Sequence, residues 1–416
     1  MAFDGFRRVI SIFRHRDYAR YTAGNSLSLI GLWMQRIGVG WLAWELTASP
    51  TWLGIIAMTE FFPVVFMGPL GGVLADRFDR TTNIIIFQSI AMVASFVLCF
   101  VTVLGLINIW ILAALTLIVG ITSGLNSASR LALAPSLVPP GDLTTAIAVN
   151  SMVFNTARFI GPAIAGAVIK LWGVEVAFFG NAISYLALIW ALRSINLARP
   201  DGATDKKERQ NLFVEMKEGF AFVASHRGAM IVLMMMLGTA LLIRPIVQLL
   251  PGIADHIFNA GVDGFAALTA AIGGGAVIGG YWMAQRRGTN TFDAGLLGIL
   301  ASAVAILCLI SINSLPVALL LTTILGAGMV ITGIGMQSTI QFAIPEKFRG
   351  RVLSLYGVCF MGGPALGTLA MGAAAEIFGL RVPIIAGAVI VATAWLIFWS
   401  KRRSITSALD AISAAE

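Results

Sequence analysis

The chain has 416 residues, of which 58% are hydrophobic and only 12% are charged. Soluble domains carry about 25% charged residues, so this composition excludes an ordinary soluble protein and indicates one that crosses a membrane many times. The formal net charge is +8, but the basic residues gather in particular junctions between apolar runs, and this placement argues against a nucleic-acid partner. The first 20 residues are polar and arginine-rich, so we expect no cleavable signal peptide.

Twelve runs of the chain are apolar over roughly the 20 residues that a membrane-spanning helix needs. In the first half of the chain, the spans are predicted at 23–46, 51–74, 83–105, 109–131, 146–171 and 175–193. In the second half, they are predicted at 229–252, 263–284, 293–312, 315–340, 352–376 and 381–400. The sequence therefore predicts an all-α membrane protein with 12 transmembrane helices.

Arginine and lysine are concentrated in alternate junctions between these spans. Basic residues favour the cytoplasmic side of a membrane protein. With both termini in the cytoplasm, most of the 28 basic residues fall on that side, and only Lys170 and Arg381 lie near the outer face. The positive charge is therefore a signal of topology, and we expect both termini to be cytoplasmic.

A polar interval at residues 194–228 separates the two groups of spans. Within it, Leu212, Phe213, Met216, Phe220 and Val223 recur at helical spacing, which predicts an amphipathic helix at the inner membrane surface. The predicted domains are thus an N-terminal six-helix bundle at 1–193, this cytoplasmic linker, and a C-terminal six-helix bundle at 229–416.

The two halves resemble each other. Gly120 precedes Pro139 by 19 residues, and Gly326 precedes Pro345 by the same 19. The fifth predicted span contains Gly161, Pro162 and Gly166, and the eleventh repeats the pattern from Gly363. Together these matches predict a duplicated six-span unit, although no single match would establish it.

The turn after the second span has a family signature. Its residues are Gly72, Leu74, Ala75, Asp76, Arg77 and Arg80, with Asp79 where a second glycine is usual. They resemble the signature of the major facilitator superfamily, and the pattern at Gly161, Pro162 and Gly166 resembles the antiporter signature of its exporters. Further stretches, such as 33–36, 45–50 and 150–162, are similar to the drug and siderophore exporter branch.

The resemblance implies two pseudo-symmetric six-helix bundles in a bacterial inner membrane. It also implies export of a small molecule by alternating access, with protons moving inward. Asp76, Arg77, Asp79 and Arg80 would form a gating latch, with Arg349 or Arg351 near the eleventh span as a partner. Gly161, Pro162 and Gly166 would let the fifth helix bend and pack closely.

Three arginines, Arg36, Arg158 and Arg244, lie deep within spans. A charge at the bilayer centre costs at least about 2.5–3.5 kcal/mol, so each is expected to face the interior or to pair with an acid. Glu60 is the only acid at such depth, and it lies at a level similar to that of Arg36. We therefore predict an Arg36–Glu60 interaction, in which Glu60 either couples transport to protons or forms a static salt bridge.

With one acid against three arginines, a central cavity would favour anionic cargo, unless the arginines bond to backbone carbonyls instead. Further polar candidates for its lining share an amide side chain within a span; they are Gln35, Asn155, Asn181, Gln337 and Gln341. No metal-ligand cluster, nucleophile constellation or ATP-binding loop is present in the sequence. We therefore expect no cofactor and no enzyme activity, and a proton gradient as the energy source.

The expected partners are a small-molecule substrate, protons and membrane lipids, and the chain is expected to act as a monomer. An importer or a lysophospholipid flippase on the same fold remains an alternative. A membrane receptor or membrane enzyme without transport is a second alternative, from another class. The internal duplication and the absence of a catalytic constellation argue against it.

Overall fold

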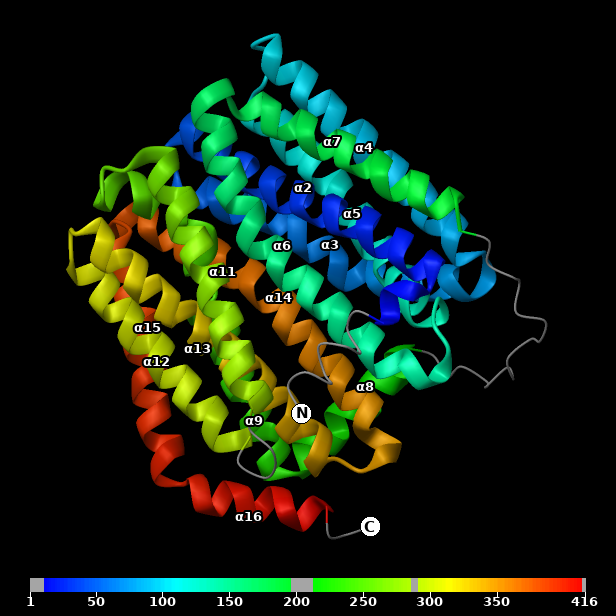
Figure 1. Ribbon diagram of the computed structural model, residues 1–416. Helices are drawn as coiled ribbons and strands as arrows, with labels where there is room; N and C mark the ends of the chain where they lie inside the picture. The colour runs from blue at the N-terminus through cyan, green and yellow to red at the C-terminus, as the bar shows by residue number, and fades with distance from the viewer. Residues whose placement is uncertain (1–10, 196–211, 286–290, 414–416) are drawn as a thin grey trace. The chain divides into compact units, whose positions relative to one another are not determined.

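The computed structural model describes residues 11–195, 212–285 and 291–413, without the side chains of Asn155, Lys347, Ser413 and residues 212–216. The predicted role of Asn155 therefore lies outside the described side chains. Every regular element in the described ranges is a helix (Figure 1). The chain is thus an all-α membrane protein, as its composition predicts.

The first half of the chain contains six long helices, and two short 3-10 turns, η1 (Ile12–Arg14) and η2 (Pro140–Asp142), precede α2 and α6. The long helices are α2 (Arg16–Thr47), α3 (Pro50–Arg77), α4 (Arg80–Val103), α5 (Ile109–Ser136), α6 (Leu143–Trp172) and α7 (Val174–Arg193). The second half contains α8 (Leu212–Ser225), α9 (Arg227–Leu242), α10 (Ile246–Gly252), the π-helical turn η3 (Ile253–Ile257), α11 (Gly261–Gln285), α12 (Thr291–Ser311), α13 (Leu315–Ala343), α14 (Glu346–Phe378), α15 (Arg381–Ser400) and α16 (Arg402–Ser413).

Among the described residues, 11 helices are long and apolar enough to cross a membrane, with α9, α10 and η3 counted as one. The remaining long helix is α2, which coincides with the first predicted span and extends it at its N-terminal end. Its less apolar composition reflects polar residues such as Asn25, Ser28 and Gln35, which are buried against other helices. Such residues hold helices together inside a membrane bundle, where water is absent.

Residues at helix ends explain where the spans stop. Asn108 accepts hydrogen bonds on its side chain from the backbone N–H groups of Trp110 and Ile111, so it caps the start of α5. Gly173 ends α6 with φ 93°, and Gly379 ends α14 with φ 78°. These positive φ values favour glycine, and the two residues stand at corresponding points of the two halves.

Two compact units account for the fold. Unit 1 consists of Met1–Ala48, Thr59–Ala203 and Phe265–Ala270; unit 2 consists of Ser49–Met58, Thr204–Gly264 and Ala271–Glu416. The division at 193 and 229 that the sequence suggests stays a prediction.

In unit 1, α2 packs closely on α7 through three glycines spaced by seven residues. A Cβ at Gly24, Gly31 or Gly38 would lie less than 3.0 Å from a side-chain atom of α7. A seven-residue repeat keeps one face of a helix against its neighbour along its whole length. This close contact brings the polar face of α2 against α4, α5 and α7.

In unit 2, the first two turns of α3 pack on the end of α14. A Cβ at Gly54 would lie 2.6 Å from Leu369 Cα. Glu376 accepts hydrogen bonds from Ser49 Oγ at 2.7 Å and from Thr51 Oγ1 at 3.2 Å. The carboxylate therefore lies at the N-terminal end of α3, where a helix favours negative charge.

Two short helices in unit 2 follow the membrane spans. In α8, Val223 is buried, but Phe220, which the sequence placed on the same apolar stripe, is exposed. An exposed Phe220 is compatible with an amphipathic helix on a membrane surface, so this role of α8 stays a prediction, and the side chains of Leu212, Phe213 and Met216 lie outside the described ones. Phe222 stacks on Phe348 of α14, with ring centroids 4.5 Å apart. The sequence did not predict α16, which turns away from α15 and buries Ile405, Leu409 and Ile412 (Figure 1).

Candidate functional site

Arg36 of α2 and Glu60 of α3 form an ion pair in unit 1, as the sequence predicts. Arg36 Nε donates a hydrogen bond to Glu60 Oε1. The Arg36 side chain is 23% exposed and that of Glu60 14% exposed, so the pair is largely shielded from solvent. Gly120 of α5 allows the close approach beside it, because a Cβ there would lie 2.7 Å from the Glu60 carbonyl oxygen.

Trp33, one turn before Arg36, lies next to two guanidinium groups. The Arg36 Cζ atom is 4.5 Å from the indole centroid, and the Arg158 Cζ atom is 5.4 Å from it. Guanidinium groups at such distances are attracted to the negative face of an aromatic ring. Phe154 packs edge-on against Trp33, with ring centroids 6.0 Å apart.

Arg158 differs from Arg36 in its partners. Among the described side chains, no carboxylate lies within ion-pair distance of Arg158, whereas Glu60 offsets the charge of Arg36. The cluster of Trp33, Arg36, Glu60 and Arg158, here named the arginine–tryptophan cluster, therefore carries one positive charge in excess. It is suited to hold an anion beside an aromatic surface.

The Gly-Pro step of α6 begins three residues after Arg158. A Cβ at Gly161 would lie 2.5 Å from Trp33 Cβ and 3.0 Å from the Ile30 carbonyl oxygen. Gly166 packs against Ala266 at a similarly short distance. Pro162 lies inside α6, where its ring removes a backbone hydrogen bond. The antiporter-like residues thus set how closely α6 approaches its neighbours.

Gln35 and Asn181 lie together inside unit 1. Asn181 Nδ2 donates to Gln35 Oε1 at 2.7 Å, and Ser184 Oγ donates to Asn181 Oδ1 at 3.2 Å. Asn181 is fully buried. The bond between Asn181 and Gln35 joins α7 to α2, and a role of the two amides in cargo binding stays a prediction. Gln337 and Gln341 are exposed on α13, and their role also stays a prediction.

Arg244 lies in unit 2, at a break in the seventh span. The break separates α9 from α10, because Pro245 has no N–H for the preceding turn and the Arg244 N–H bonds to the Thr239 carbonyl. Arg244 Nη1 donates to the Phe360 carbonyl at 3.0 Å, and its Cζ atom lies 3.7 Å from the Phe360 ring centroid. The sequence analysis did not select Phe360. The signal for it was its position, because Phe360 lies three residues before Gly363, as Arg158 lies three residues before Gly161.

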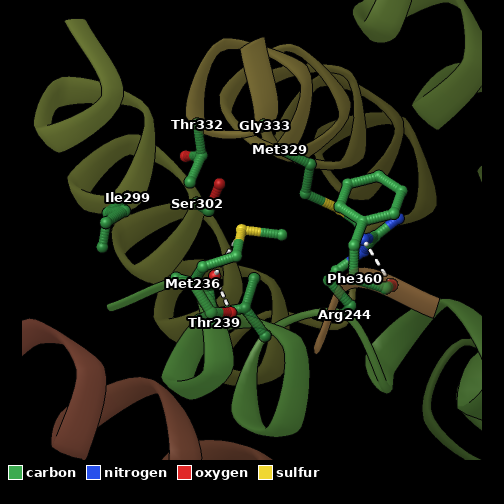
Figure 2. Close-up of a pocket in the computed structure, with 10 residues that line it drawn as sticks. Met236, Thr239, Arg244, Ile299, Ser302, Met329, Thr332, Gly333 and Phe360 are labelled. Atoms are coloured by element: carbon green, nitrogen blue, oxygen red, sulfur yellow. Dashed lines mark hydrogen bonds between the residues drawn. The ribbon is translucent and has the colours of Figure 1, made fainter. Parts of the chain in front are cut away.

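A small cavity opens beside Arg244 (Figure 2). Its polar lining consists of Arg244 and the hydroxyl-bearing residues Thr239, Ser302 and Thr332. Methionine, isoleucine and phenylalanine side chains form the remaining wall. Each hydroxyl comes from a different helix, since Thr239 belongs to α9, Ser302 to α12 and Thr332 to α13.

The charged segment from Gly72 to Arg80, which the sequence places in a turn, lies mostly in the last turns of α3, and only Phe78 and Asp79 separate α3 from α4. Asp79 caps α4, because its Oδ2 atom accepts from the Thr82 N–H at 2.7 Å. Arg80 Nη1 donates to the Ala132 carbonyl at 3.5 Å, and Asp76 and Arg77 are exposed. The two residues suggested as latch partners have contacts within unit 2, and the latch itself stays a prediction. Arg351 Nη1 pairs with Glu218 at 2.7 Å, and Arg349 Nε donates to the Ile344 carbonyl.

A bundle of long apolar helices with partly shielded charges within the spans indicates a polytopic membrane protein. The chain belongs to the family described as "Transmembrane secretion effector", whose model matches residues 9–416, and with it to the major facilitator superfamily. It is a transporter rather than an enzyme.

Relatives across most of the chain are similar to it at modest identity. An uncharacterized MFS-type transporter, YfiS of Bacillus subtilis, is 26% identical over 86% of this chain and 87% of its own length. The enterobactin exporter EntS of Escherichia coli is 25% identical over 86% of this chain and 84% of its own. Macrolide efflux protein A of Streptococcus pyogenes is 24% identical over 80% and 83%.

Solved structures share the fold. A peptide transporter POT has a TM-score of 0.75 at 13% identity, covering 94% of this chain and 95% of that one. A bacterial homologue of the lysosomal transporter Spinster has a TM-score of 0.70 at 15% identity, covering 94% and 97%. The predicted major facilitator fold is confirmed.

Proposed function

We propose that the chain exports a small amphiphilic anion from the cytoplasm, with protons moving inward. Membership of the superfamily supports transport by alternating access. Two relatives that align with most of the chain carry the names of an exporter and an efflux protein, which supports the outward direction. The siderophore and the macrolide in those names define the range of cargo size that we expect.

The observation that carries the anionic cargo is the excess charge of the arginine–tryptophan cluster. Arg158 is stacked on Trp33 and has no acid partner among the described side chains. A partly shielded guanidinium in this state favours an incoming carboxylate or catecholate, because an unpaired charge is costly in a region of low polarity. Trp33 and Phe154 add an aromatic surface against which the apolar part of the cargo packs.

Glu60 is the proposed proton carrier. Its carboxyl group lies in a largely shielded ion pair with Arg36, deep within a span, where ionisable groups are usually functional. The energy source is then the proton gradient. Asp76, Arg77, Asp79 and Arg80 are proposed as the cytoplasmic latch, both termini as cytoplasmic, and the protein as a monomer in contact with lipid.

Everted membrane vesicles from a bacterium that expresses the chain test this function. The vesicles are energised by respiration and given radiolabelled enterobactin, a catecholate, or radiolabelled erythromycin, a cation at neutral pH. We expect uptake of the catecholate that a protonophore stops. Uptake of erythromycin alone would contradict the anionic cargo, and accumulation only in right-side-out vesicles would indicate an importer or flippase.

A further inference from the structure

The cavity beside the break in the seventh span has room for a small polar group. Its volume is about 20 Å³. A cavity of about 10–15 Å³ is enough to hold one water molecule. The cavity therefore accommodates at least one water-sized group.

The hydroxyl protons on the cavity wall are already used. Thr239 Oγ1 donates to the Met236 carbonyl at 2.9 Å, Ser302 Oγ to the Gly298 carbonyl at 2.8 Å, and Thr332 Oγ1 to the Gly328 carbonyl at 2.8 Å. A hydroxyl has a single proton and two lone pairs. The three hydroxyls therefore have only acceptor capacity left for an occupant, and all three side chains are buried.

These features select the chemistry of the occupant. The guanidinium of Arg244 disfavours a cation, and the three oxygen lone pairs disfavour an anion. An alkyl group would leave the buried hydroxyl oxygens without a donor. A neutral O–H group fits this lining. Its proton is donated to a hydroxyl oxygen of the wall, and its own oxygen accepts a hydrogen bond from a donor.

We propose that this cavity is a binding site for one neutral O–H group. The group comes either from a water molecule or from a hydroxyl of the cargo. The cargo source rests on the proposed export function, whereas the water source does not. In both cases the bound oxygen links α9, at the edge of the helix break, to α12 and α13.

The first test is the structure of the purified full-length protein at a resolution that shows ordered water. We expect one oxygen peak within hydrogen-bond distance of Thr332 Oγ1 and of a second cavity group. Thr332→Val should remove the peak. Thr322→Val is the matched control, because Thr322 lies on the same helix, is buried and donates to the Ala318 carbonyl, but does not line the cavity.

The second test separates the two sources with 2,3-dihydroxybenzoate and benzoate, which differ only in their two hydroxyls. Two results together support water: an oxygen peak in the structure without either compound, and an equal loss of affinity for both compounds in Thr332→Val. A peak only with the dihydroxy compound, and a loss of about threefold to tenfold for it alone, support a cargo hydroxyl. Ser302→Ala repeats the measurement if Thr332→Val folds poorly.

The proposal is overturned by two results together. No oxygen peak appears with or without the dihydroxy compound, and Thr332→Val binds both compounds with the same affinity as Thr322→Val. An anomalous signal from chloride or bromide at the site would also overturn it. Failure of export in vesicles would leave the peak in place, so the two proposals fail separately.

Discussion

Arg158 and Phe360 occupy corresponding positions, each three residues before the Gly-Pro step of its helix, and each belongs to a guanidinium–aromatic stack. In unit 1 the cation lies on the Gly-Pro helix and the ring on the first span. In unit 2 the ring lies on the Gly-Pro helix and the cation on the seventh span. The duplication has thus kept the stack while exchanging the helices that carry the two partners. Each unit therefore contains one guanidinium group stacked on an aromatic ring.

Arg158→Gln is expected to weaken binding of an anionic probe such as 2,3-dihydroxybenzoate by about tenfold to one-hundredfold, because a charge-assisted contact is lost. Isothermal titration of the purified protein measures this change. Arg381→Gln is the control, since Arg381 donates to Asn313 on the surface of unit 2. Equal affinity in the two variants would remove Arg158 from the binding site.

Glu60→Gln is expected to abolish the response of export to a proton gradient. The amide oxygen still accepts the hydrogen bond from Arg36, so the variant should fold, but it has no proton to exchange. Uptake into everted vesicles, with and without a protonophore, measures the coupling. Glu45→Gln, which changes an exposed carboxylate at the end of α2, should leave coupling intact. Normal coupling in Glu60→Gln would make the Arg36–Glu60 pair a static salt bridge.

Gly161→Ala is expected to lower the stability of the protein by about 1–3 kcal/mol, because the new methyl group overpacks the contact with Trp33. Gly72→Ala, near the end of α3, meets nothing within 4 Å, so the stability of this variant should be equal or higher. Thermal unfolding in the same detergent compares the two variants. A stable Gly161→Ala protein would show that α6 can shift away from α2 at little cost.

Reversing the charges of Glu218 and Arg351 tests how α8 is attached. Glu218→Lys should expose α8 to limited proteolysis, because it places two cations together at the start of α14. The double variant Glu218→Lys/Arg351→Glu should restore protection. Since the pair is partly exposed, the effect on overall stability should be below about 1 kcal/mol. Unchanged cleavage in the single variant would mean that the Phe222–Phe348 stack alone holds the helix.

The sequence predicts the spans well, because long apolar runs leave few alternatives in a membrane. It also predicts the Arg36–Glu60 pair, because only one acid lies deep enough to offset a buried arginine. It does not predict that α2 begins at Arg16 rather than near residue 23, since a helix extends beyond the apolar part of its sequence. The short polar α16 was missed for the same reason: its three buried residues are too few to form an apolar run.

The functional geometry was less predictable. Three arginines within apolar spans are visible in the sequence, but their aromatic partners depend on helix rotation. A sequence that contains 25 phenylalanines does not single out Phe360. The cavity beside Arg244 depends on three hydroxyls from three helices, and none of them stands out among the many serines and threonines that bond to their own helix.

The hydrogen bonds from Ser49 and Thr51 to Glu376 have a consequence for expression of the two halves as separate fragments. Residues 49–58 precede the central linker in the chain, yet they pack within unit 2. A gene divided at the linker would place the Glu376 carboxylate on one fragment. The hydroxyl groups of Ser49 and Thr51, which donate to this carboxylate, would lie on the other fragment. Neither fragment would carry a complete unit, so we expect the two to reach a stable fold only when they are synthesised together.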